Sequence, residues 1–94
     1  MFKWLNKQGV ESDRGFIVQA ISRFVIEYRQ QSKKISVHVE MNNVTDGEVS
    51  IIVHKSSFMC WDDGSHIAEN EQVQIIKNFK DAMNFQDIDV IIEN

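Results

Sequence analysis

The chain has 94 residues, of which 43% are hydrophobic, and a formal net charge of −4 at pH 7. A chain of this length suits one domain with a small core, and its hydrophobic content argues against intrinsic disorder. Residues 1–34 hold seven basic and three acidic side chains, whereas residues 35–94 hold three basic and eleven acidic ones. The negative charge argues against nucleic acid as a partner, because binding to phosphates requires clustered cations.

Cys60 is the one cysteine of the chain. An internal disulfide is therefore excluded, which fits the reducing cytosol. The first residues include no apolar run of signal-peptide length, and no later run approaches the roughly 18 apolar residues of a membrane span. We therefore expect an unprocessed cytoplasmic protein, with a single domain over residues 1–94 and no membrane contact.

The N-terminal segment, residues 1–14, is ambiguous in pattern. Phe2, Trp4 and Leu5 suit either a short helix or an edge strand. A β-like pattern then begins with a short apolar run over residues 16–21, which predicts the first clear strand.

Two further segments alternate between apolar and polar residues with the period of a half-buried strand. Residues 23–29 place Phe24, Ile26 and Tyr28 on one face, which predicts that these three side chains belong to the core. Residues 35–41 alternate strictly, and only a short polar turn separates the two segments. We expect them to pair as an antiparallel hairpin.

The second half of the chain predicts a strand, a helix and a closing strand. A turn with an Asp-Gly pair precedes an apolar strand over residues 49–53. Residues 69–84 carry apolar side chains at three- and four-residue spacing, the period of an amphipathic helix. Residues 88–92 alternate again, as a last strand. The expected apolar stripe of the helix consists of Val73, Ile76, Phe79, Ala82 and Met83, with Ile75 alongside.

Together these segments predict an α+β fold. We expect a mainly antiparallel sheet of about five strands, with one C-terminal amphipathic helix packed on one face before the last strand. The other face of the sheet must be exposed to solvent, closed by curvature of the sheet or covered by another chain. A homodimer and a homo-oligomeric structural role therefore stay open from the sequence.

The loop before the helix sets an aromatic side chain beside two carboxylates, Trp61, Asp62 and Asp63. Trp61 is either a core residue or an interface anchor, since tryptophan is enriched at binding hot spots. No complete catalytic or cofactor motif accompanies this loop. We therefore expect binding rather than catalysis, with no catalytic residue, no metal and no cofactor. The predicted partner-binding surface comprises Trp61, Asp62, Asp63, Glu40, Asp46 and Glu48.

Three other kinds of site are alternatives to this hypothesis. A metal- or thiol-dependent enzyme could use His54, Cys60 and His66, although their spacing matches no usual zinc pattern and a Cys–His pair must meet in space. Acid–base catalysis or magnesium binding could use carboxylates of the same predicted surface, but a turn explains an aspartate beside glycine more simply. An RNA-binding sheet face could combine N-terminal basic residues with aromatic side chains such as Phe16 and Tyr28.

An ordered set of segments over about residues 15–93 carries a family resemblance. The segments are the hairpin 23–40, the strand 49–54, Ser56-Ser57, Trp61-Asp62, the stretch 67–85 and the strand 88–93. This ordering resembles small immunity proteins of bacterial polymorphic-toxin and contact-dependent growth-inhibition systems. The resemblance implies an α+β fold, no enzymatic activity and cytoplasmic neutralisation of a cognate toxin domain, often a nuclease, by tight binding. Residues 1–14 have no counterpart in it.

The charge of the chain agrees with this implication at one point. Nucleases hold phosphates in basic clefts, and an acidic surface would complement such a cleft and accelerate encounter. The hypothesis from the sequence is therefore that the acidic surface around Trp61 binds a basic toxin domain.

Overall fold

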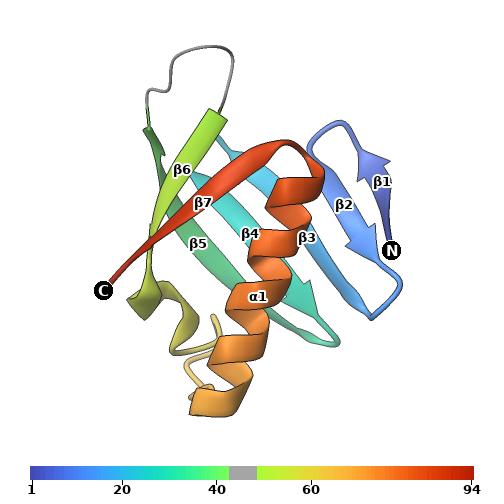
Figure 1. Ribbon diagram of the computed structural model, residues 1–94. Coiled ribbons are helices and arrows are strands. Elements are labelled where there is room, and N and C mark those ends of the chain that lie inside the picture. Colours follow the sequence, from blue (N-terminus) through green and yellow to red (C-terminus); the bar gives the residue numbers. More distant parts are fainter. Residues whose placement is uncertain (43–48) are drawn as a thin grey trace.

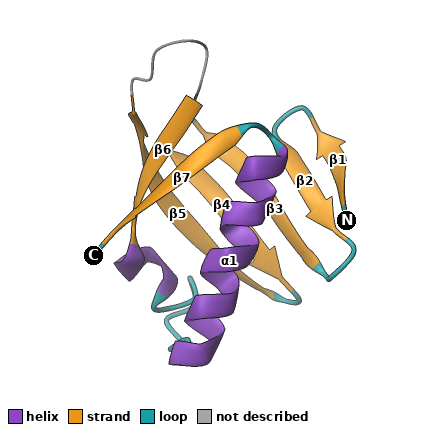
Figure 2. Cartoon of the chain, viewed as in Figure 1, coloured by secondary structure: helices purple, strands orange, loops and turns teal. Residues whose placement is uncertain are grey.

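In the residues that the computed structural model describes, 1–42 and 49–94, seven strands form one curled sheet and one α-helix lies on its inner side (Figure 1). In Figure 2 the helix stands in front of β3 and β4, and β6 and β7 curl round beside it. The predicted α+β class is confirmed. The elements are β1 (Phe2–Asn6), β2 (Gly9–Ser12), β3 (Phe16–Ser22), β4 (Val25–Gln30), β5 (Lys33–Asn42), β6 (Val49–His54), the 3₁₀ helix η1 (Lys55–Phe58), α1 (Glu69–Phe85) and β7 (Ile88–Glu93).

Neighbouring strands of the sheet follow the order of the chain from β1 to β7. The first five pairs are antiparallel, but β7 runs parallel to β6. Parallel neighbours require a crossover, because a tight turn joins only antiparallel strands, and α1 provides it here. The predicted hairpin of the two middle strands and the predicted helix before the last strand are confirmed. The predicted strand number was too low, and the sheet is mixed.

The N-terminal segment forms a hairpin of two strands at one edge of the sheet. Val10 on β2 is fully buried, and Phe2 on β1 packs against the core. Gly9 meets the neighbouring strand closely, since a Cβ at this position would lie 2.8 Å from Cβ of Gln19. A side chain at position 9 would therefore push β2 away from β3. Of the two interpretations that the sequence left for this segment, the edge strand is the one that forms.

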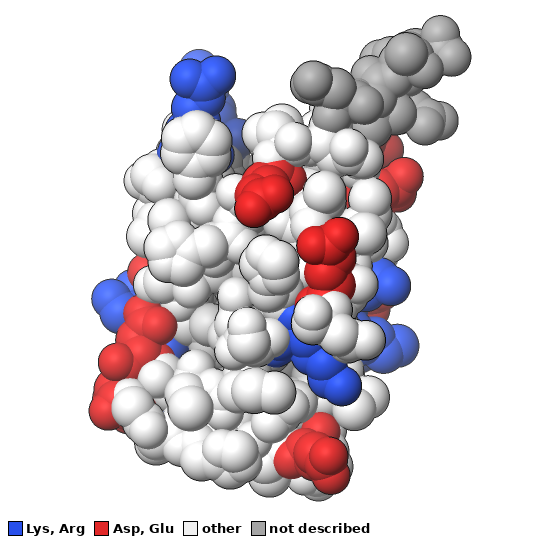
Figure 3. Space-filling model, turned by 90° about the vertical axis from the view of Figure 1, so that its left-hand side faces the viewer, with Lys and Arg blue, Asp and Glu red and all other residues white. Residues whose placement is uncertain are grey.

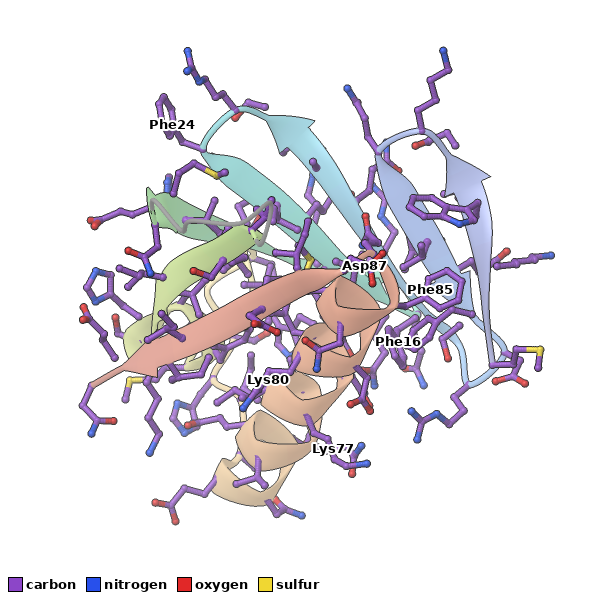
Figure 4. All side chains as sticks on the ribbon, turned by 45° about the horizontal axis from the view of Figure 1, so that its top comes forward. Phe16, Phe24, Lys77, Lys80, Phe85 and Asp87 are labelled. Carbon is purple, nitrogen blue, oxygen red and sulfur yellow. The ribbon has the colours of Figure 1, made fainter. Side chains whose placement is uncertain are left out.

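Inward-facing residues of the middle strands build the core, as their alternation predicts. Ile26 and Tyr28 are buried on β4, next to Ile35 and Val37 on β5. The prediction for Phe24 was wrong, because β4 begins only at Val25 and Phe24 lies in the turn before it, where 56% of the residue is exposed. Figure 4 shows the Phe24 side chain standing clear of the sheet.

The buried face of α1 differs from the predicted apolar stripe. Val73 is 70% exposed, whereas Gln72 and Asn78, which lie outside the predicted stripe, are buried. Gln72 Nε2 donates a hydrogen bond of 2.7 Å to the carbonyl oxygen of Ile67, which lies just before the helix. A buried amide costs little when such a partner is present, so the helix can turn polar side chains inward. Its remaining buried residues are Ile75, Phe79, Ala82 and Met83.

A polar network joins α1 to the middle of the sheet. Asn78 Nδ2 donates to the Tyr28 hydroxyl at 3.1 Å, and this hydroxyl donates to Oε1 of Gln30 at 2.6 Å. Gln74 Nε2 in turn donates to Oδ1 of Asn78 at 2.9 Å. Burial raises the pKa of Tyr28 above its usual value. The hydroxyl therefore stays protonated and keeps its donor role.

None of the helices in the described ranges combines the length and the apolar character that a membrane crossing requires.

Two substitutions two residues apart on α1 test which side of the helix is buried. We expect Ile75→Ala to lower the free energy of unfolding by about 2–5 kcal/mol, because it deletes buried methyl groups. Val73→Ala should change it by less than about 0.5 kcal/mol, because the side chain is exposed. Urea denaturation followed by circular dichroism measures both. If Val73→Ala lowered the free energy of unfolding more than Ile75→Ala, the buried side of the helix would be the one expected from the sequence.

The hydrogen bond between helix and sheet can be tested with a double-mutant cycle. Tyr28→Phe and Asn78→Ala should each lower the free energy of unfolding by about 1–3 kcal/mol, because each leaves a buried polar partner without its bond. The double variant should lose less than the sum of the two single losses, since the second change removes a group that is already unpaired. Urea denaturation gives the three values, and strict additivity would show that the two groups are not coupled.

Candidate functional site

The loop that carries Asp62 and Asp63 seals an open edge of β5. Residues 33–38 of β5 pair with β4, whereas residues 39–42 pair with β6. Beside Lys34 and Ser36, β6 therefore does not cover the strand. The Asp62 amide donates to the Lys34 carbonyl at 2.9 Å, and the Ser36 amide donates back to Asp62 Oδ1 at 3.0 Å. The backbone amide and the carboxylate of Asp62 thus make hydrogen bonds to β5 that a neighbouring strand would otherwise make.

A second set of hydrogen bonds holds the rest of the loop. The Ser36 hydroxyl donates to Asp62 Oδ2 at 2.7 Å. Asp63 Oδ1 accepts from the amide and the hydroxyl of Ser65, and the bond from this hydroxyl is the main reason why the pKa of Asp63 is lowered. Lys33 Nζ donates to Ser65 Oγ at 2.9 Å and lies 4.0 Å from Asp63 Oδ2. Both carboxylates are therefore fixed in place and exposed.

Trp61 lies beneath this loop. It is 7% exposed and belongs to the hydrophobic core. Its amide donates to the Ser65 carbonyl at 2.9 Å, and Lys33 Nζ lies 6.0 Å from the centre of its ring. Of the two roles that the sequence allows for Trp61, its position is that of a core residue that supports the loop.

Glu40 stands on the outer side of the sheet, away from α1. On β5 the buried residues Ile35, Val37 and Val39 face inward, so the intervening Glu40 faces outward. Glu40 is paired with Ile52 of β6, and Ile52 is paired with Ile91 of β7. Directly paired residues point to the same side of a sheet, so these three side chains form a row on the outer face.

Two acidic residues of β7 extend this row. Asp89 and Glu93 alternate with the inward residues of the strand and flank Ile91 on its outward side. Ser36, which binds the Asp62 carboxylate, lies outward on β5 four positions before Glu40, about 13 Å along a strand that rises 3.3 Å per residue. The outer acidic face is defined here as Glu40, Ile52, Asp62, Asp89, Ile91 and Glu93.

Within residues 1–42 and 49–94, the carboxylates of the outer acidic face form no ion pair. Seven acidic side chains of the described residues lie farther than 4.0 Å from every Lys, Arg and His side-chain nitrogen and from the N-terminal amine, and four of the seven belong to this face. The segments of β6 and β7 contain no Lys or Arg, but two exposed histidines share this side of the sheet: His54 of β6 is paired with Glu93, and His38 lies two positions before Glu40 on β5. Figure 3 views the side that bears β5, β6 and the C-terminus and shows acidic side chains among uncharged residues in its upper half, with basic side chains lower and at the margins. Unpaired carboxylates of one sign make a negative potential at this face.

The structure thus brings together only part of the predicted surface. Glu40 and Asp62 share one side of β5, and Asp63 follows in the same loop. Asp46 and Glu48 lie outside the described residues. Asp89 and Glu93 were not predicted for this surface, because the parallel pairing of β7 with β6 leaves no mark on the sequence. Their alternation with Ile88, Val90 and Ile92 was the signal that could have placed them on an outward face.

The residues of the alternative sites are distributed as follows. Cys60 and His66 lie opposite one another in an isolated antiparallel bridge, and both are exposed, as is His54. Within residues 1–42 and 49–94, no group of three or more His, Cys, Asp and Glu side chains could hold a metal ion. Phe16 and Tyr28 stack on one another in the core at 5.5 Å between ring centres, so they offer no surface to a nucleic-acid base.

No protein-family model matches this chain, and no curated protein and no solved structure matches it either.

The role of Asp62 in closing the β5 edge gives a stability test. Asp62→Ala should lower the free energy of unfolding by about 1 kcal/mol, because the Ser36 amide loses its acceptor. Asp62→Asn should lose less, since its side-chain oxygen can still accept from that amide. Asp89→Ala, which removes an exposed carboxylate without a partner, is the control and should be neutral. Thermal and urea unfolding measure the series, and equal effects of Asp62→Ala and Asp89→Ala would contradict the role of Asp62.

Proposed function

We propose that this chain is an immunity-type protein, which binds a cognate bacterial toxin domain in the cytoplasm and neutralises it without transforming a substrate. The observation that carries the proposal is the outer acidic face, where the carboxylates of Glu40, Asp89 and Glu93 lie around Ile52 and Ile91 and Asp62 adds a fourth farther along β5. The family resemblance of the sequence supports the same function. The toxin domain expected from this chemistry has a basic cleft, as nucleases do.

The composition of the outer acidic face suits an interface with a protein. Ile52 is half-buried and Ile91 is 41% exposed, so the centre of the face offers apolar area to a partner. Interfaces commonly combine such an apolar centre with a polar rim. Glu40, Asp89 and Glu93 supply charges around this centre that would attract a basic partner over several ångströms and orient it on approach.

The rigidity of this face favours binding as well. Three paired strands carry five of its six residues, and hydrogen bonds to Ser36 hold the sixth, Asp62. Side chains on such a scaffold lose little conformational freedom when a partner binds, and this lowers the cost of association.

A charge-reversal pair tests the proposal. The double variant Glu40→Lys, Glu93→Lys changes the charge of the outer acidic face by four units and leaves Asp62 and its loop intact. The control is Glu69→Lys, Glu71→Lys, which makes the same change at two exposed positions at the start of α1. Each protein, immobilised, captures partners from cells of the source bacterium. The captured domain is then produced alone and tested for growth inhibition.

We expect the wild type and the control to retain the same toxin domain and to restore growth when co-expressed with it. The outer-face variant should associate at least about tenfold more slowly at low salt, because electrostatic steering is reversed. Stopped-flow mixing at several salt concentrations measures the rate. The proposal fails if the captured partner is not toxic, or if both variants lose binding equally.

A further inference from the structure

A cavity opens at the end of the molecule that carries the β3–β4 turn and the last turn of α1. Its volume is about 270 Å³. Its inner wall consists of buried apolar side chains, one from each of four strands and one from the helix: Val18, Ile26, Val39, Ile51 and Met83. The cavity lies on the inner side of the sheet, so it is separate from the outer acidic face.

The rim of this cavity is basic. Lys7 from the β1–β2 turn and Arg23 from the β3–β4 turn both line it, and no acidic residue among those described does so. Neither cation forms an ion pair with an acidic side chain of residues 1–42 or 49–94. The Arg23 guanidinium lies 5.7 Å from the centre of the Phe24 ring, in the same turn. In a chain with a net charge of −4, two cations over an apolar cavity are a local exception.

We infer that this cavity binds a small molecule with an apolar chain and a single anionic head group. The apolar wall would take the chain out of water, which contributes about 25 cal/mol for each Å² buried. Lys7 and Arg23 would bind the head group at the rim through charge-assisted hydrogen bonds, which are stronger than neutral ones.

The size of the cavity limits the ligand. Its volume lies just below the lower end of typical ligand pockets, about 300 Å³. A chain of about eight carbons with a carboxylate or phosphate head group therefore fits, and a long-chain lipid would not be enclosed.

The methionines of the chain provide a local readout. Met41 and Met83 line the cavity, whereas Met1 and Met59 do not. The full chain, labelled with ¹³C at the methionine methyl groups, is titrated with octanoate, octyl phosphate, octanol and octylamine. Binding at the proposed site should shift the Met41 and Met83 signals in a saturable manner and leave the Met1 and Met59 signals in place.

The head group is tested by its charge. Octanoate and octyl phosphate should bind about tenfold or more tightly than octanol and octylamine, and the tighter of the two anions identifies the preferred head group. Lys7→Gln, Arg23→Gln should reduce the affinity for octanoate by about tenfold and leave that for octanol unchanged. The control Lys55→Gln, Lys80→Gln removes the same charge elsewhere and should have no effect.

Three results would overturn the inference. The first is the absence of any shift at Met41 and Met83 up to millimolar octanoate. The second is equal affinity for octylamine and octanoate. The third is unchanged octanoate binding by the variant of Lys7 and Arg23. None of these results affects the proposed role of the outer acidic face, because that face is tested with a protein partner.

Discussion

A single helix must cover the inner side of a seven-stranded sheet, and this constraint shapes the molecule. A flat sheet of this width would leave its outer strands uncovered, so the sheet curls until its inward residues meet α1 and one another. The contact at the centre is the hydrogen bond from Asn78 to the Tyr28 hydroxyl, surrounded by buried apolar side chains. It fixes the helix against the middle of the sheet, where an apolar contact alone would allow it to slide or rotate.

The two candidate sites lie on opposite sides of the sheet. Because β5 pairs first with β4 and then with β6, β6 leaves part of the β5 edge uncovered, and the loop around Asp62 closes that gap. The apolar cavity opens on the inner side of the sheet, between buried residues of four strands and the last turn of α1.

Strand alternation was the part of the fold that the sequence predicted best. Every second residue of β5 from Ile35 to Val39 is apolar, and these three residues are buried. Alternate side chains of a strand point to the same side of the sheet, so the pattern alone indicates which residues face the interior. The register of α1 was harder to predict. Its buried amides have partners that only the folded chain supplies, the Ile67 carbonyl and the Tyr28 hydroxyl, so hydrophobicity alone placed Val73 inside.

The candidate surface was predictable only in part, for a related reason. The acidic character of the loop residues Asp62 and Asp63 is visible in the sequence, but the bond between Asp62 and Ser36 joins positions 26 residues apart. The position of β7 depends on a parallel pairing with β6 across the helical crossover, and no local pattern encodes such a pairing. Asp89 and Glu93 therefore join the surface only through the tertiary fold.

The place of β7 in the sheet has a consequence for the order in which the fold can form. β7 contributes three of the six residues of the outer acidic face. Val49 of β6 meets Ile88 of β7 across 39 positions, and the entropy lost in closing so long a loop must be offset before this pairing adds stability. A partial fold of the first six strands therefore lacks half of the outer acidic face, which is complete only once the helical crossover brings β7 against β6.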